Sequence, residues 1–340
     1  MNFSSDNSAP AHPAILEALA AANVGAAPSY GGDPWTTRAT QAIRDVFERE
    51  CDVFLVATGT AANALALTAL CPPWGAVFCH RFAHVAEDEA GAPEFFTGGA
   101  KLLLLDGPSG KIEPAALREA AARFSRANVH GAQPFAVSIT QATESGAIWR
   151  ADEVAALCET ARGAGLKVHM DGARFANALV HAGGSPADMT WRAGVDILSF
   201  GATKNGALGV EAIVSFDPAI SAALPHLRKR AGHLFSKHRL LGAQMAGYLE
   251  DGLWLRLAAH ANAMAQAIAA TFTARGVALA HPVEANEVFA HLSPDAARRL
   301  EAAGARIYQW AQDGPDVYRF VASWATTQAE IDALARALDG

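Results

Sequence analysis

The sequence predicts an α/β protein with a large, mostly parallel sheet covered by helices, followed by a smaller α+β domain. Up to residue 216, short apolar runs alternate with helical patterns, which is typical of strand–helix–strand units. Beyond residue 216, a long helical region precedes a second set of short strands. A chain of 340 residues with 51% hydrophobic residues is long enough to bury two cores. We therefore place the large domain at residues 1–245 and the small domain at residues 246–340.

The large domain begins with a clear helix signal. Asp33 and Pro34 suit the N-cap and the first helical position, and Ile43, Val46 and Phe47 form the apolar face that follows. Buried strands are expected at residues 53–57, 76–79, 102–105, 135–140, 166–170, 195–199 and 211–216. Further helices are expected at residues 61–70 and 152–162.

The second half of the chain changes pattern. A helical region is expected over residues 218–275, with interruptions near Gly242 and Gly252. Strands are expected at residues 277–280, 288–292, 306–310 and 318–323, and helices at residues 295–303 and 328–338. This mixture predicts the smaller α+β domain.

Composition argues against several classes of protein. The net charge of −7 comes with no basic stripe, so nucleic acid is not an expected partner. No uncharged apolar run reaches the ~18 residues of a membrane helix, and the first residues lack the order of a signal peptide. The four cysteines form no CxxC pair, which is typical of reduced core thiols. We expect a soluble, cytoplasmic protein that acts on a small molecule.

Lys204 and Asp171 carry the strongest chemical signal. Each directly follows an apolar run predicted as a buried strand, and open α/β sheets bind ligands at the carboxyl ends of their strands. Pyridoxal 5'-phosphate (PLP) requires a lysine for a Schiff base and an acid beside its pyridine nitrogen. A surface lysine and a turn-forming aspartate are the alternatives, but the chain has only six lysines and the pairing favours PLP.

Thr58, Gly59 and Thr60 are the candidate phosphate cradle. They lie between the first predicted strand and the helix that starts near Ala61, where free N–H groups and the helix dipole favour an anion. His80 and His84 have i,i+4 spacing, but Arg81 stands where the zinc-protease motif has glutamate, so no metal is expected.

Arg174 and Arg319 are the candidates for binding a substrate carboxylate. The planar guanidinium suits a bidentate bond to a carboxylate. Arg174 lies three residues beyond Asp171, so both can face one site. Arg319 stands inside an apolar strand-like run, where it faces either a ligand or solvent.

Taken together, these residues resemble the low-specificity L-threonine aldolases of the β-eliminating lyase family, which are PLP enzymes of fold type I. The resemblance covers nearly the whole chain. The segments that carry it are residues 4–7, 29–33, 83–85, 89–92, 169–175 and 199–206, together with Asn63. It implies retro-aldol cleavage of L-threonine, L-allo-threonine and related β-hydroxy-α-amino acids to glycine and an aldehyde, by a homotetramer with active sites at a dimer interface.

The resemblance also implies a role for individual residues. Lys204 would be the Schiff-base lysine, Asp171 would pair with the pyridine nitrogen, and His84 would stack on the ring. Thr58, Gly59 and Thr60 would surround the phosphate. Ser5, Tyr30, Arg174 and Arg319 would bind the substrate, with Arg174 also next to the cofactor. His130 would lie near the β-hydroxyl, and Arg239, with Lys237 as a rival, would reach the phosphate of a neighbouring subunit.

Two questions stay open at the level of sequence. Either His84 or His130, directly or through water, could be the base that takes the β-hydroxyl proton, since a neutral histidine suits that task near pH 7. An aminotransferase or a β-eliminating lyase is the main alternative activity, although an aminotransferase needs no second base at that hydroxyl. A non-catalytic PLP-fold sensor domain is less expected, because the chain has no basic segment for DNA.

Overall fold

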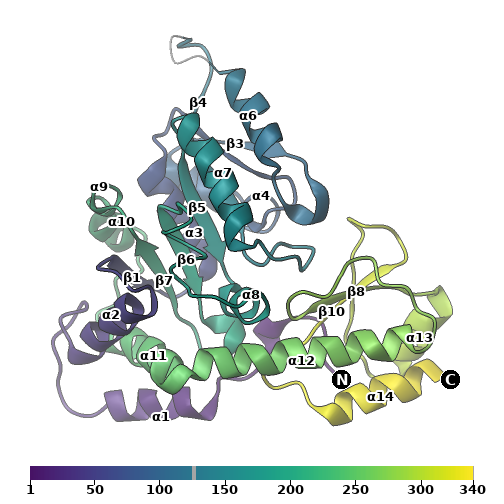
Figure 1. Cartoon of the computed structure of the whole chain (residues 1–340). Helices are drawn as coiled ribbons and strands as arrows, with labels where there is room; N and C mark the ends of the chain where they lie inside the picture. The colour runs from purple at the N-terminus through teal and green to yellow at the C-terminus, as the bar shows by residue number, and fades with distance from the viewer. Residues whose placement is uncertain (125–127, 340) are drawn as a thin grey trace.

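The computed structural model describes residues 1–124 and 128–339, and its centre is a seven-stranded sheet (Figure 1). The strand order is β1-β7-β6-β5-β4-β2-β3. Its strands are β1 (Asp52–Val56), β2 (Gly75–His80), β3 (Lys101–Leu105), β4 (Gln133–Thr140), β5 (Lys167–Gly172), β6 (Ile197–Gly201) and β7 (Glu211–Ser215). Every neighbouring pair is parallel except those of β7, which runs antiparallel to both β6 and β1. The predicted mostly parallel sheet is confirmed.

Helices cover both faces of this sheet because alternate residues of each strand point to opposite sides. Leu55, Leu198 and Val214 join one core, whereas Phe54 and Ile213 join the other. The first core includes residues of α1 (Pro13–Ala22), α2 (Pro34–Val46), α6 (Pro114–Ala122), α7 (Ala151–Gly163), α8 (Phe175–Ala182) and α11 (Arg239–Leu249). The second includes residues of α3 (Gly59–Leu70), α4 (His84–Glu87), α9 (Pro218–Ser221) and α10 (Leu224–Arg230), and α5 (Ala92–Thr97) packs at its edge.

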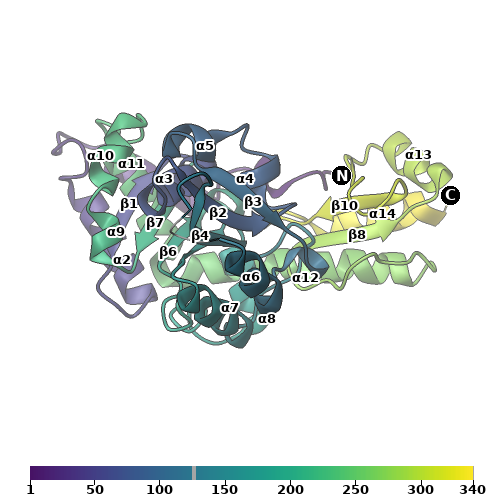
Figure 2. The same cartoon turned by 90° about the horizontal axis from the view of Figure 1, so that it is seen from above.

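A second, three-stranded antiparallel sheet has the order β8-β10-β9. It consists of β8 (Glu287–His291), β9 (Tyr308–Gln309) and β10 (Val317–Val321), and it packs with α13 (Pro294–Ala302) and α14 (Gln328–Asp339). The long helix α12 (Leu253–Thr273) runs beneath both sheets (Figures 1 and 2). Leu257 belongs to the core of the large sheet and Phe272 to that of the small one, so one helix fixes the two sheets relative to each other.

The amino terminus also belongs to the small sheet. Phe3 is fully buried against Phe272 and Phe320, and its carbonyl accepts the N–H of Val321. This anchors the following short helix η1 (Asp6–Ser8) next to the large sheet. The division at residue 245 stays a prediction; Met245 itself lies inside α11.

Two sequence-based predictions in this half are wrong. Gly242 does not interrupt a helix but lies inside α11, where a Cβ would stand 2.5 Å from the backbone nitrogen of Thr36. Glycine is therefore required there for the close approach of α2. Residues 277–280 form no strand, and Leu279 makes only an isolated bridge to Ala290. The interruption at Gly252, with its φ of +69°, is confirmed.

The cysteines and the helix lengths bear on two further expectations from the sequence. All four cysteines are buried and unpaired, as expected of core thiols. Within residues 1–124 and 128–339, no helix combines the length and the apolar character needed to span a bilayer.

Candidate active site

A cavity of about 390 Å³ opens at the carboxyl ends of β4, β5 and β6 and extends to the small sheet. This volume lies within the range of ~300–1,000 Å³ that is usual for small-molecule sites. Nine of the predicted site residues line it: Ser5, Thr58, Gly59, Thr60, His84, Asp171, Arg174, Lys204 and Arg319. Residues from the amino terminus, the large sheet and the small sheet therefore meet in one place.

Asp171 is buried and held in a fixed orientation. It lies on β5 in register with Thr140 and Ser199 of the neighbouring strands, so it projects from the middle of the sheet. Its Oδ2 accepts a hydrogen bond from Asn63 Nδ2 at 2.7 Å, and its Oδ1 accepts the N–H of Ala173 at 3.0 Å. The carboxylate thus has one defined direction in which to meet a ligand.

Lys204 lies in the turn η3 (Thr203–Asn205) that follows β6. The turn is fixed by Asn205, whose side-chain amide donates to Tyr248 Oη and to the carbonyl of Trp254, both at 2.8 Å. In the part of the chain that the structure describes, the Lys204 ammonium forms neither a hydrogen bond nor an ion pair, although it lines the cavity. It is available to a ligand.

The amino terminus of α3 forms the opposite end of the cavity. Thr58 is the N-cap, and its Oγ1 accepts the N–H of Ala61 at 3.2 Å. The N–H groups of Gly59 and Thr60 belong to the first turn and have no intrahelical partner. A Cβ placed on Gly59 would meet nothing within 4 Å, so the space in front of these amides is open. Such an end is suited to an anion.

His84 begins α4 and takes part in a buried polar cluster. Its Nδ1 donates to Glu89 Oε1 at 2.8 Å, and this hydrogen bond raises the pKa of the imidazole although burial opposes it. Asn63 Nδ2 donates both its protons, one to Glu89 and one to Asp171. A ring nitrogen of His84 and a carboxylate oxygen each of Glu89 and Asp171 lie within 4.8 Å of one another, but these groups already form hydrogen bonds within the protein. His80 ends β2 and bonds Gly107, so it does not share a helix with His84.

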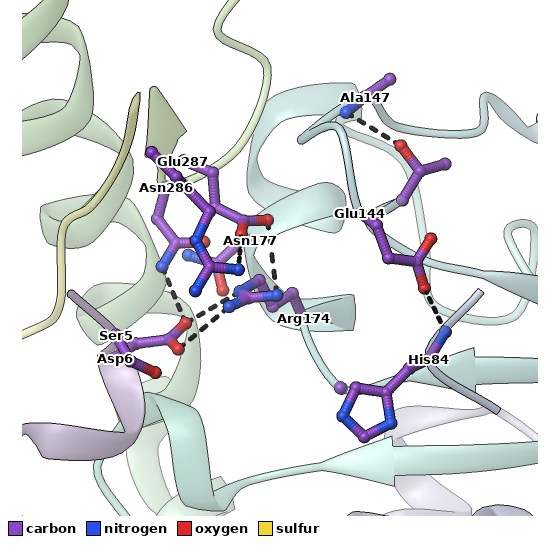
Figure 3. A network of polar contacts seen from close by, with 12 residues as sticks. Ser5, Asp6, His84, Glu144, Ala147, Arg174, Asn177, Asn286 and Glu287 are labelled. Carbon is purple, nitrogen blue, oxygen red and sulfur yellow. Dashed lines mark hydrogen bonds and ion pairs between the residues drawn. The ribbon is translucent and has the colours of Figure 1, made fainter. Parts of the chain in front are cut away.

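Arg174 is already engaged by acids of this chain (Figure 3). Its Nε and Nη2 donate to the two oxygens of Asp6 at 2.8 and 3.0 Å, and its Nη1 lies 3.4 Å from Glu287 Oε2. Burial would lower the pKa of Arg174, but the charges of Asp6 and Glu287 raise it instead. One edge of the guanidinium is thus fixed by Asp6, and the end formed by Nη1 and Nη2 faces Glu287 and the cavity.

Arg319 lies on β10, the central strand of the small sheet, and not on an edge. Its guanidinium stands 4.9 Å from the centre of the Trp310 ring and 5.4 Å from that of Tyr308, which is a cation–π arrangement. Its Nη2 donates to the carbonyl of Ser4 at 3.2 Å, and Nη1 lies 3.8 Å from Glu287 Oε1. The aromatic rings hold the charge at the edge of the cavity.

Three predicted site residues lie outside this cavity. His130 is exposed and precedes β4, whose eight residues separate it from the carboxyl end of that strand by ~25 Å. The prediction that His130 lies near the substrate therefore fails for the chain's own cavity. Tyr30 is 52% exposed, and Arg239 donates to the carbonyl of Gly25 at 2.9 Å on the same surface.

Four acids that sequence reasoning passed over do line the cavity: Asp88, Glu144, Glu211 and Glu287. Burial raises the pKa of Glu144 and that of Glu211 to about 7. Glu211 accepts the N–H of Ala202 at 2.7 Å, next to the turn that carries Lys204. Glu144 follows β4, at the same edge of the sheet as Asp171 near the end of β5, and the strand-end rule would have pointed to it. Glu287 comes from the small sheet, for which no such rule exists.

The chain belongs to the beta-eliminating lyase family, whose model matches residues 2–310. It is 45% identical, over 98% of its own length and 95% of the relative's, to a low specificity L-threonine aldolase of a Pseudomonas strain. A solved threonine aldolase from Leishmania major is 30% identical, with a TM-score of 0.93 over 99% of this chain and 98% of the other. An N-succinyldiaminopimelate aminotransferase from Mycobacterium tuberculosis is 21% identical, with a TM-score of 0.73 over 99% of this chain and 92% of the other. At that identity the likeness shows the fold alone. The protein is a PLP-dependent enzyme of fold type I.

The residues of the cavity fit PLP. The open first turn of α3 suits the phosphate, the oriented carboxylate of Asp171 suits the ring nitrogen, and the unpaired amine of Lys204 suits the aldehyde carbon. The imidazole of His84 stands at the same cavity, where it can cover one face of the ring.

Proposed function

We propose that the protein cleaves L-threonine, L-allo-threonine and related β-hydroxy-α-amino acids to glycine and an aldehyde, with PLP as cofactor. The observation that carries this proposal is the meeting of Lys204 and Asp171 with two arginines in one cavity. Lysine and aspartate suit PLP, and the arginines suit the α-carboxylate of an amino acid. The Pseudomonas relative that carries the aldolase name spans nearly the same length.

PLP, when bound, supplies an electron sink for the pair of electrons released as the Cα–Cβ bond breaks. The protein does the rest. Asp171 would hold a proton at the ring nitrogen, and Lys204 would hold the aldehyde carbon of the cofactor. The first turn of α3 anchors the phosphate, so that the ring does not move.

Arg319 and the free end of Arg174 bind the substrate carboxylate and turn the Cα–Cβ bond perpendicular to the ring. Ser5, at the N-cap of η1, lies beside them. Asp6 holds Arg174 in place from behind, because it binds a different edge of the guanidinium. The β-hydroxyl then lies toward His84, and a base removes its proton. Of the two predicted histidines, only His84 lies at this cavity.

We also propose that the enzyme works in the cytoplasm as a homotetramer, a dimer of dimers with active sites at a dimer interface. Tyr30 and Arg239 lie on one surface of this chain, away from its own cavity. Tyr30 donates its N–H to the carbonyl of Ser236, which brings the two segments together. If these segments reach the cavity of a neighbouring subunit, Arg239, or its rival Lys237, would contact the phosphate there. Tyr30 would then contact the substrate. Light scattering on the purified protein measures the mass that tests this proposal.

The activity is tested by giving the purified, PLP-loaded protein L-threonine and measuring acetaldehyde and glycine. Equal amounts of the two products are expected. Formation of 2-oxobutanoate and ammonia without acetaldehyde would indicate elimination, and conversion dependent on a 2-oxo acid would indicate an aminotransferase. Either result would overturn the proposal.

A further inference from the structure

Glu144 lies at the cavity with a geometry that the mechanism above leaves unused. It belongs to the turn after β4, on the same edge of the sheet as Asp171. Its Oε1 accepts the backbone N–H of His84 at 2.8 Å, which fixes the carboxyl beside the first turn of α4 (Figure 3). Its Oε2 is buried and has no hydrogen-bond partner within 3.5 Å among the described residues, although the side chain of Thr140 lies near enough to lower the pKa of the carboxyl. A buried polar oxygen without a partner is costly, so its presence requires an explanation.

We propose that Glu144 is the base that takes the proton of the substrate's β-hydroxyl. This inference rests on the proposed aldolase function and assigns the step that the function requires. Glu144 and His84 line the same cavity as Lys204, so a hydroxyl on the substrate's Cβ has both within the same small space. Among the described residues, no other carboxyl at the cavity accepts the backbone N–H of His84.

The imidazole of His84 has a different role in this proposal. Its Nδ1 donates to Glu89, and that hydrogen bond raises the pKa of the imidazole. The same bond holds the ring in one orientation, in which it can stay over the cofactor while the neighbouring carboxylate accepts the proton.

The charges around Glu144 set its protonation near neutrality. Burial, the largest effect, and the charge of Asp171 raise its pKa to about 7, while the N–H of His84 opposes this. The titratable and charged groups that act on it are His84 of α4, Asp171 of β5, Arg174 after β5 and Cys79 of β2, and Glu287 of β8 lines the same cavity. A base works best when its pKa is close to the working pH.

The step balances in atoms and electrons. The O–H bond of the β-hydroxyl breaks and its proton passes to the Glu144 carboxylate. The electron pair left on oxygen forms the C=O bond of the aldehyde as the Cα–Cβ bond breaks, and bound PLP would supply the sink for the pair of that bond. Glu144 then returns its proton to water, and Cα takes one from water to give glycine.

The test compares wild-type holoenzyme with Glu144→Gln and His84→Phe. Glutamine keeps an oxygen to accept the N–H of His84 but cannot take a proton; phenylalanine keeps an aromatic face but cannot titrate. We expect Glu144→Gln to keep the yellow cofactor spectrum and to lose ~10²–10⁴-fold in kcat for L-threonine, the usual contribution of a general base. Wild type and His84→Phe should both show kcat rising with pH through about 7, because only the ionised carboxylate accepts a proton.

Exchange of the glycine α-proton with deuterated water, followed by NMR, separates catalysis from positioning. It involves no β-hydroxyl, so Glu144→Gln should retain it. If Glu144→Gln loses exchange and cleavage equally, or cleaves L-threonine at near the wild-type rate, the assignment is overturned. It is also overturned if the rise of kcat with pH disappears in His84→Phe and remains in Glu144→Gln. Failure of the proposed function is distinguishable, because the wild type itself would then release no acetaldehyde.

Discussion

Asp6→Asn removes one charge from the buried ion pair that fixes Arg174. The carboxylate is 1% exposed and receives three hydrogen bonds, two from Arg174 and one from Asn286 at 3.0 Å. Burial alone would raise its pKa, but the charges of Arg174 and Lys204 and these hydrogen bonds hold the pKa below its ordinary value. The carboxylate is therefore more stable ionised in the folded protein than in the unfolded chain.

The expected effect on stability follows from these contacts. Removing one partner of a buried ion pair typically costs ~3–5 kcal/mol; the lower value applies because asparagine keeps one acceptor and Glu287 stays near Arg174. The entropy of unfolding is ~2.1 cal/mol/K per residue, or about 0.7 kcal/mol/K for a chain of 340 residues. Dividing the two gives a fall in Tm of about 4 °C.

The assay is thermal unfolding of the holoenzyme, followed by circular dichroism at one scan rate. Asp188→Asn is the matched control, since it breaks an ion pair of similar length, 3.1 Å to Arg192, on the exposed surface. Its Tm should change by less than about 1 °C. If Asp6→Asn shifts Tm no more than this control does, the buried pair does not stabilise the fold and the reasoning is refuted.

The pH dependence of the difference provides an independent check. A carboxyl whose folded pKa is lowered stabilises the fold above its unfolded pKa, near ~4, and loses that contribution as pH falls through the folded pKa. The gap in Tm between wild type and Asp6→Asn should thus be complete at pH 7 and narrow below about pH 4. A gap that is constant down to pH 3 would contradict the ion-pair explanation.

Three further predictions concern the catalytic groups. Borohydride reduction of the yellow holoenzyme should attach the cofactor to the peptide that contains Lys204, and labelling of any other lysine would end that assignment. Asp171→Asn should retain at least part of its cofactor but lose orders of magnitude in kcat, because the electron sink weakens mainly in the transition state; an unchanged kcat would exclude the role. Arg319→Ala should lose roughly 30-fold to several thousandfold in kcat/KM with its spectrum intact, whereas Arg319→Lys should recover only part, since a point charge lacks the bidentate fork. An alanine variant that unfolds, or that stays near wild-type activity, would show that Arg319 is structural.

The large sheet was predictable because each of its strands is a short apolar run that feeds two cores. The antiparallel direction of β7 follows from a feature that the prediction did not use. Nine residues separate Gly201 of β6 from Glu211 of β7, whereas parallel neighbours need a crossover of a dozen or more. The missing strand at residues 277–280 shows the opposite limit: an apolar run forms a strand only where a neighbour pairs with it, and Leu279 has a single bridge.

The acids around the arginines could not be predicted in the same way. Asp6 and Glu287 are separated by 281 positions in the sequence and meet only because Phe3 anchors the amino terminus to the small sheet. No local pattern contains that contact. It nevertheless determines which edge of Arg174 is available to a substrate, so the carboxylate site depends on long-range packing as much as on the motif around Asp171.

His130 and Glu144 show that looking at the carboxyl end of every strand would have improved the prediction of the site. Asp171 and Lys204 were chosen because each follows a buried strand, and the candidate base was then sought among histidines instead of among strand ends. Glu144 follows β4 by four residues, and His84 follows β2 by the same number. In a parallel sheet all of these ends lie at one edge, so their side chains converge on one cavity, whereas a residue before a strand lies a strand's length away. Position relative to the strand, more than residue type, decides which titratable groups can share a substrate.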